Sequence, residues 1–220
     1  MKIPQLVIGN KNYSSWSLRA WLILAKSGVE FEEVKVSLTG RGYREKLFQY
    51  SPTGRVPVYI EDDLVVWDSL AIAEYFVEQY PSLLPSDIKQ RAKARSLAAE
   101  MHSGFAALRS RMPMNCRATN RRVDMTPELS DDIERIRDIW TDCRNHNEET
   151  GSWLFGDFTI VDAMYAPVVF RFNTYGVECP PKATKYLNMV LNDPDIQRWS
   201  EAAKNEADII EEEEVGIIST

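Results

Sequence analysis

The chain reads RVPVYI at residues 55–60 and VVWDSL at residues 65–70, and these two stretches restrict its fold more than any others. Proline lacks the N–H that a strand interior donates, so Pro57 is out of place at the start of an apolar strand. A cis bond between Val56 and Pro57 resolves this, because it turns the chain sharply and leaves the amide and carbonyl of Val56 free. An extended peptide could then pair with these groups as an added strand.

Asp68 and Ser69 follow the second stretch, where a strand ends and a helix begins. The free N–H groups of a helix start and the serine hydroxyl can receive a carboxylate. The ten residues between Pro57 and Asp68 allow a hairpin that brings both elements to one edge. Each element alone is also typical of an ordinary turn or cap. Together they predict a site for a small acidic peptide, for which glutathione is the obvious candidate.

The first 80 residues alternate between strand and helix patterns. The order is an apolar strand, an amphipathic helix, an alternating strand, a polar and weakly helical stretch, a hairpin and a last helix, at residues 6–8, 14–28, 31–36, 41–50, 58–67 and 71–80. A βαβ unit followed by αββα predicts a parallel first pair with a right-handed crossover. We therefore expect a thioredoxin-like α/β domain over residues 1–80.

An all-helical domain is expected to follow. Residues 81–87 (PSLLPSD) break the pattern and indicate a linker, and no convincing strand pair comes after them. Within residues 88–210 we expect helices over 88–111, 128–148, 161–175, 182–191 and 195–209. Thr159 and Asp162 have the spacing of a capping box. The acidic run at residues 211–214 indicates that residues 211–220 form a solvated, frayed tail.

Composition limits the possible partners and location. The net charge of −7 in 220 residues argues against a nucleic-acid surface. No run approaches the roughly 20 apolar residues of a membrane span, and the start lacks the apolar core of a signal peptide. Cys116, Cys143 and Cys179 show neither C-x-x-C nor zinc spacing, which predicts no metal site and fits a reducing compartment. We expect a cytoplasmic protein without membrane or nucleic-acid partners.

A serine-rich turn offers thiol chemistry. Ser14 lies just after the first strand and just before the first helix, so its hydroxyl and the helix start could both stabilise a thiolate. Ser15 and Ser17 are near-equivalents by type, and a plain helix cap is the alternative role of Ser14. Tyr13 is a competing hydroxyl donor. No cysteine precedes residue 116, which excludes cysteine-based exchange at this turn.

Three motifs resemble those of the cytosolic glutathione S-transferase family, and the resemblance covers nearly the whole chain. The Val56-Pro57 and Asp68-Ser69 elements resemble its glutathione clamp, and residues 159–163 (TIVDA) resemble the cap of its core helix. Residues 13–19 (YSSWSLR) resemble the catalytic loop of the serine-type branch, nearest the zeta class with its SSCSxR pattern. Trp16 and Trp21 depart from that pattern, replacing a cysteine and an arginine, so the zeta substrate does not follow.

The resemblance implies a serine-type transferase that activates glutathione for conjugation or isomerisation of a small electrophile, with detoxification as the general role and a homodimer as the assembly. It implies Ser14 and Ser15 as catalytic residues. The expected glutathione contacts are Ser14, Arg55, Val56, Pro57, Asp68 and Ser69, and the expected electrophile pocket is Trp16, Met101, Phe105, Arg109 and Tyr165.

Two alternatives stay open. Dehalogenation or peroxide reduction would use the same site. A catalytically silent protein of the same fold, acting as a binding or regulatory module, would keep the fold without using the serines.

Overall fold

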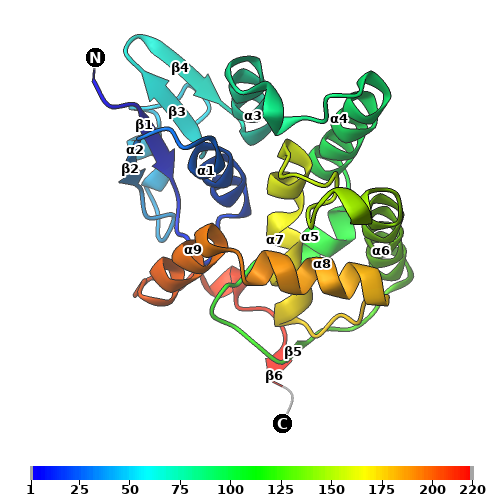
Figure 1. Ribbon diagram of the computed structural model, residues 1–220. Coiled ribbons are helices and arrows are strands. Elements are labelled where there is room, and N and C mark those ends of the chain that lie inside the picture. Colours follow the sequence, from blue (N-terminus) through cyan, green and yellow to red (C-terminus); the bar gives the residue numbers. More distant parts are fainter. Residues whose placement is uncertain (1, 219–220) are drawn as a thin grey trace.

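The computed structural model describes residues 2–218 and places a small sheet domain against a larger helical one (Figure 1). The sheet domain contains strands β1 (Gln5–Ile8), β2 (Glu32–Lys35), β3 (Val58–Glu61) and β4 (Leu64–Trp67), with helices α1 (Ser15–Ser27), α2 (Tyr43–Leu47) and α3 (Ser69–Gln79). The strand order is β2-β1-β3-β4, with β1 parallel to β2 and the other pairs antiparallel. This confirms the expected thioredoxin-like layout.

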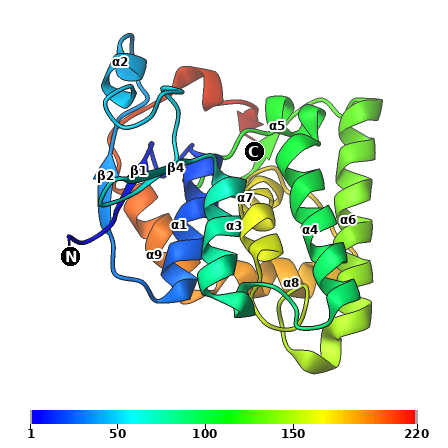
Figure 2. The ribbon, with the colours of Figure 1, turned by 90° about the horizontal axis from the view of Figure 1, so that it is seen from above.

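Alternation along β1 separates two apolar layers. Leu6 and Ile8 belong to the main core, which includes side chains of α1 and α3, while Val7 packs with Leu47 and Val58 on the face covered by α2. Figure 2 shows α1 and α3 side by side, between the sheet and the helical domain. Since β1 is buried on both faces, the start of α1 is held firmly relative to the sheet.

The helical domain is built around one buried helix. Its elements are η1 (Pro81–Leu83), α4 (Ile88–Ser103), α5 (Ala106–Arg111), β5 (Arg121–Arg122), α6 (Pro127–Asn147), η2 (Glu148–Thr150), α7 (Ile160–Thr174), α8 (Pro181–Leu191), α9 (Pro194–Lys204), η3 (Glu211–Glu213) and β6 (Ile217–Ile218). Helix α7 is buried over almost its whole length and contacts α1, α4 and α8. It therefore joins the two domains.

The predicted capping box of α7 is confirmed. Asp162 is fully buried and accepts hydrogen bonds from the Thr159 N–H at 2.9 Å and the Leu154 N–H at 3.0 Å. Tyr186 of α8 donates its hydroxyl to the same carboxylate at 3.1 Å. The cap thus ties α7 to its preceding loop and to α8.

The single helix expected over residues 88–111 is wrong, because the chain breaks between α4 and α5. Gly104 is extended and Phe105 has a φ of 60°, which ends the helical path. Asp132 of α6 then accepts the Leu108 N–H at 2.9 Å near the start of α5. The break is thus accompanied by a contact with a helix that is distant in the sequence.

The C-terminal end also differs from the expectation. Helix α9 ends at Lys204 and not near 209, and the two-residue strands β5 and β6 pair antiparallel although no strand was expected in this half. The expected solvated tail begins at 211, yet Glu214 bonds to Tyr13 and Arg121. Residues 213–216 are therefore half-buried against the protein, whereas Glu211, Glu212 and Ile217 are exposed, and residues 219 and 220 lie outside the described part.

Candidate functional site

A cleft of about 770 Å³ lies where the start of α1 meets the helical domain. Nine of the predicted site residues line it, namely Ser14, Ser15, Trp16, Arg55, Val56, Pro57, Asp68, Ser69 and Arg109. They come from the β1–α1 turn, the loop before β3, the β4–α3 junction and α5. The structure thus gathers the serine turn and the two clamp elements at one cavity.

Ser14 is the N-cap of α1 and part of a hydroxyl pair. Its Oγ accepts from the Ser17 N–H at 3.3 Å and lies 2.7 Å from the Ser17 Oγ. The Ser17 Oγ in turn accepts from the Gly9 N–H at 3.0 Å. When Ser17 donates to Ser14, the proton of Ser14 is available to a sulfur atom in the cleft. Ser17 thereby becomes a partner of the site.

The Ser15 hydroxyl makes fewer hydrogen bonds than the Ser14 hydroxyl. It is the first residue of α1 and is 6% exposed, and its side chain forms no hydrogen bond with any residue between 2 and 218. Its backbone N–H donates to the Tyr13 carbonyl at 2.9 Å. Both serines therefore remain candidate donors.

The Tyr13 hydroxyl is already paired. It donates to Glu214 at 2.6 Å and accepts from Arg117 at 2.8 Å. Burial, reinforced by Glu214, raises the pKa of Tyr13 above its ordinary value. The phenol is consequently a poorer donor to a thiolate than either serine.

The loop before β3 carries the amide half of the expected clamp. The Val56–Pro57 bond is cis, as predicted. The sheet pairing of β3 begins only at Val58, so the backbone of Val56 lies outside the ladder and at the cleft. Arg55 is exposed at the rim.

Asp68 and Ser69 form the start of α3. Asp68 has a φ of 76° and caps the helix by accepting from the Leu70 N–H at 2.8 Å. The Ser69 side chain is fully buried, and its Oγ has no hydrogen-bond partner among the described residues. A buried hydroxyl at a helix N-terminus on the cleft wall is suited to receive a carboxylate oxygen.

Three arginines make the inner end of the cleft basic. Trp16 lies between Arg19 and Arg109, whose guanidinium carbons are 4.5 and 4.9 Å from its ring centroid. Burial and the neighbouring Arg109 lower the pKa of Arg171 to about 10. Arg19 is buried with its Nε and Nη1 unpartnered in the described structure, and its pKa is likewise lowered by burial and by Arg109. This region favours an anion.

His102, which sequence reasoning did not place here, also lines the cleft. Its Nε2 is 3.4 Å from the Asp68 carboxylate, and its ring packs edge-on against Trp16 at 5.3 Å. Burial lowers the pKa of His102, with Asp68 opposing the shift and Arg19 and Arg109 adding to it. The imidazole is therefore neutral at pH 7.

Three predicted pocket residues are elsewhere. Met101, Phe105 and Tyr165 belong to the hydrophobic core and do not line the cleft. Phe105 and Tyr165 pack against each other with ring centroids 6.5 Å apart. Their helical spacing reflects packing between α4, α5 and α7, which is the common role of such residues.

The cleft also includes residues far away in the sequence. Arg171 comes from α7, and Ile210 and Glu213 come from the C-terminal segment. Burial raises the pKa of Glu213, which Arg171 partly offsets. No local motif marks these positions, since only the tertiary fold brings them to the cleft.

Residues 2–218 contain no group of three or more His, Cys, Asp or Glu side chains arranged to hold a metal ion. None of the helices that they form is long and apolar enough to cross a membrane. All three cysteines are free thiols.

Relatives of this chain are found among solved structures and among known sequences. A glutathione transferase homologue from Burkholderia, solved with bound glutathione, superposes with a TM-score of 0.70 at 26% identity, covering 93% of this chain and 100% of that one. Stringent starvation protein A homologue from Haemophilus influenzae is 27% identical over 193 residues, covering 83% of this chain and 84% of that protein.

Two further comparisons establish the family. Residues 13–79 match the family model described as glutathione S-transferase, N-terminal domain. Maleylacetoacetate isomerase from Rattus norvegicus is 33% identical over 186 residues, which cover 81% of this chain and 83% of that protein. The serine turn and both clamp elements lie within the residues that match the family model, the relative covers most of this chain, and the chain therefore belongs to the glutathione S-transferase family.

Proposed function

We propose that this protein is a glutathione transferase in which the hydroxyl of Ser14 or Ser15 stabilises the glutathione thiolate for attack on a small electrophile. The observation that carries the proposal is that both serines, Val56 and Ser69 line one cleft. The relative solved with bound glutathione and the relative named maleylacetoacetate isomerase support the same chemistry.

The energetic demand on the serine is modest. An ordinary thiol has a pKa of about 8.5, so only a small fraction is ionised at neutral pH. Lowering this pKa by about two units requires ~2.7 kcal/mol of differential stabilisation. One hydrogen bond to a charged group supplies about 1.5–3 kcal/mol, and a helix N-terminus adds about 0.3–1 kcal/mol. A serine at the start of α1 is therefore sufficient.

The clamp residues would hold the peptide by complementary groups. The backbone of Val56 would pair with the cysteinyl unit as an added strand, so the identity of its side chain should matter little. The Ser69 hydroxyl and the start of α3 would receive the γ-glutamyl carboxylate. Asp68 would face the ammonium group or hold the turn, and Arg55 would meet the glycine carboxylate.

The basic inner end favours an electrophile that carries negative charge, because Arg109 and Arg171 line it and Arg19 lies behind Trp16. In conjugation the thiol gives its proton to water and the sulfur electron pair forms a bond to carbon. Either a leaving group departs with its bonding pair, or the π pair of a conjugated double bond is displaced by the new bond and takes up a proton. Isomerisation would add and then expel the sulfur.

The experiment is a pH titration of thiolate absorbance for glutathione with the purified protein. We expect the pKa of the bound thiol to fall by about two units, and the variant, S14A or S15A, that restores the free value identifies the donor. Binding without a shift would mean that the clamp works and the serines do not. Absence of binding would contradict the proposal. A homodimer, which the family resemblance implies, stays a prediction that light scattering checks.

A second candidate is a protein of this fold that binds a partner without catalysis. It is favoured by the similarity to stringent starvation protein A homologues, whose name states no reaction. The same titration distinguishes the two candidate functions, because a partner-binding module has no need to lower the pKa of a thiol.

A further inference from the structure

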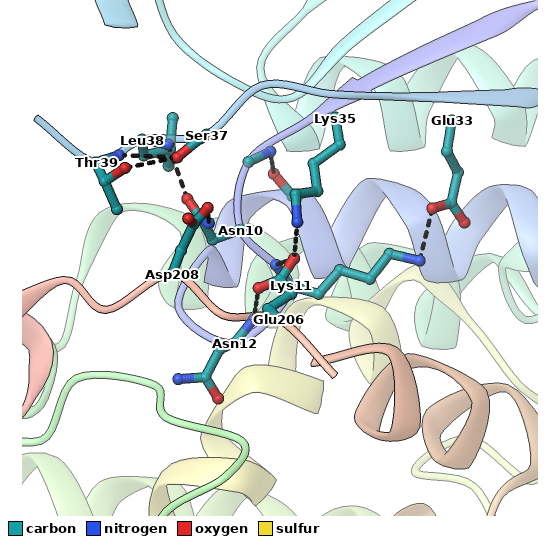
Figure 3. Close-up of polar contacts among 12 residues, drawn as sticks. Asn10, Lys11, Asn12, Glu33, Lys35, Ser37, Leu38, Thr39, Glu206 and Asp208 are labelled. Carbon is teal, nitrogen blue, oxygen red and sulfur yellow. Dashed lines mark hydrogen bonds and ion pairs between the residues drawn. The ribbon is translucent and has the colours of Figure 1, made fainter. Parts of the chain in front are cut away.

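The turn that precedes Ser14 is held by the other end of the chain. Glu206, which follows α9 and is 8% exposed, places its carboxylate against two backbone amides of this turn (Figure 3). It accepts from the Lys11 N–H at 2.9 Å and from the Asn12 N–H at 3.1 Å. The Lys35 ammonium lies 3.0 Å from the same carboxylate.

Asn10 completes the turn. Its carbonyl accepts from the Tyr13 N–H at 3.2 Å and the Ser14 N–H at 2.8 Å. Its side chain donates to Asp208 at 2.7 Å and accepts from the Leu38 N–H at 2.8 Å (Figure 3). Every backbone amide from residue 11 to 14 is thus bonded, and half of these bonds depend on Glu206.

We propose that Glu206 is a positioning residue, whose carboxylate fixes the turn over residues 10–13 so that the hydroxyls of Ser14 and Ser15 point into the cleft. This inference rests on the proposed function. A serine must be held closely to donate to a sulfur atom, because hydrogen bonds weaken steeply with distance and angle. Without Glu206, two buried amides would lack an acceptor and the turn would rearrange.

The test variant is Glu206→Gln, which keeps one carbonyl oxygen but turns an –NH₂ group toward the other amide donor. We expect the Lys11 or Asn12 amide to exchange hydrogen about tenfold faster or more, as loss of a hydrogen bond to a charged group implies. We expect kcat for conjugation to fall about tenfold and the pKa of bound glutathione to rise toward its free value. The affinity for glutathione should change little, because Arg55, Val56 and Ser69 are untouched.

Two control variants separate this role from a general loss of charge or stability. Lys35→Ala removes the ion pair to Glu206 but leaves both amide bonds, so exchange at Lys11 and Asn12 and kcat should stay near the wild-type values. Glu148→Gln removes a carboxylate that pairs with Lys182 at 2.8 Å on the distant side of the helical domain, and it should also leave the site unchanged.

Several outcomes overturn the inference. One is unchanged amide exchange in E206Q, and this readout is valid even if the wild-type protein proves not to bind glutathione. Another is a lower unfolding midpoint in E206Q with unchanged kcat and unchanged thiol pKa, which would leave Glu206 a purely structural role. A third is a fall in kcat in K35A that equals the fall in E206Q. Failure of the proposed function itself would be seen separately, in the wild-type titration.

Discussion

At the scale of single residues, the proposed thiolate donor is a hydroxyl group whose neighbour is itself hydrogen-bonded. Ser17 is this neighbour, because its Oγ receives the Gly9 N–H and faces the Ser14 Oγ at 2.7 Å. An accepted hydrogen bond polarises a hydroxyl, which strengthens its own donation to the next oxygen. Ser17 would therefore support Ser14 without touching the thiolate.

The first prediction concerns Ser17→Ala. We expect kcat/KM for glutathione conjugation to fall about tenfold, which is less than for removal of the donor itself, because Ser14 would keep its proton but lose its neighbour. The unpaired Gly9 N–H should lower the free energy of unfolding by about 1–2 kcal/mol. Steady-state kinetics and urea unfolding check both effects. Ser110→Ala, in an exposed turn of α5, is the control, and an S17A protein as active as wild type would exclude the relay.

The second prediction concerns pH and His102. Its pKa is lowered in the folded protein, chiefly by burial, so the folded state favours the neutral imidazole. The unfolded chain then takes up a proton first as the pH falls below about 6.5. The stability that neutral His102 contributes is therefore fully present above that pH. It is lost progressively as the pH falls toward the lowered pKa of the folded state.

As the pH falls below about 6.5, the unfolding free energy of His102→Gln should therefore decrease less steeply than that of the wild type. Urea midpoints measured over this range of pH test the expectation. His146, the other histidine of the chain, is exposed on α6 and supplies the matched control, H146Q. If the H102Q protein loses as much unfolding free energy on acidification as the wild type, groups other than His102 are responsible for the pH dependence.

At the scale of elements, most helices and strands were predictable because their signals are local. The apolar spacing of α1 and α6, the apolar run of β1 and the cap of α7 are all patterns of neighbouring residues. The break after Gly104 was not predicted, and the contact of Asp132 of α6 with the Leu108 N–H near the start of α5 is a long-range one that the local pattern does not contain. Met101, Phe105 and Tyr165 were misplaced for the same reason, as spacing alone does not distinguish a core face from a cleft face.

The third prediction concerns the cap of α7. Asp162→Ala would leave the buried N–H groups of Leu154 and Thr159 and the hydroxyl of Tyr186 without their acceptor. We expect the free energy of unfolding to fall by about 3 kcal/mol or more, as for other disrupted buried networks. Asp87→Ala is the control, because Asp87 caps α4 at an exposed start and should cost only about 1 kcal/mol. Equal losses in urea unfolding would contradict the central role of α7.

At the scale of the whole molecule, the elements from the first 80 residues that line the cleft were predictable and their distant neighbours were not. Ser14, Val56 and Ser69 lie within the first 80 residues and carry recognisable local patterns. Arg171, Glu206 and Glu213 reach the same region from more than 100 residues away, and the acidic run at 211–214 suggested a solvated tail instead. Their roles follow from long-range contacts, which a single sequence does not reveal.

Arg117 connects three of these distant regions. Its guanidinium donates to the carbonyls of Glu206 and Asp208 and to the Tyr13 hydroxyl, so one side chain joins the loop after α5, the C-terminal segment and the serine turn. Loss of these bonds should release the C-terminal segment before the rest of the protein unfolds, because local opening follows the weakest set of contacts.

The last prediction is that Arg117→Ala lowers the free energy of unfolding by about 2 kcal/mol and speeds tryptic cleavage after the exposed Lys204. Arg135→Ala is the matched control, since Arg135 makes two hydrogen bonds to Glu100 on an exposed surface and should contribute less than about 1 kcal/mol. Mass spectrometry of timed digests identifies the cut. If R117A is cleaved no faster than R135A, the C-terminal segment is held by its carboxylates alone. Glu206 then fixes the turn over residues 10–13 without a contribution from Arg117.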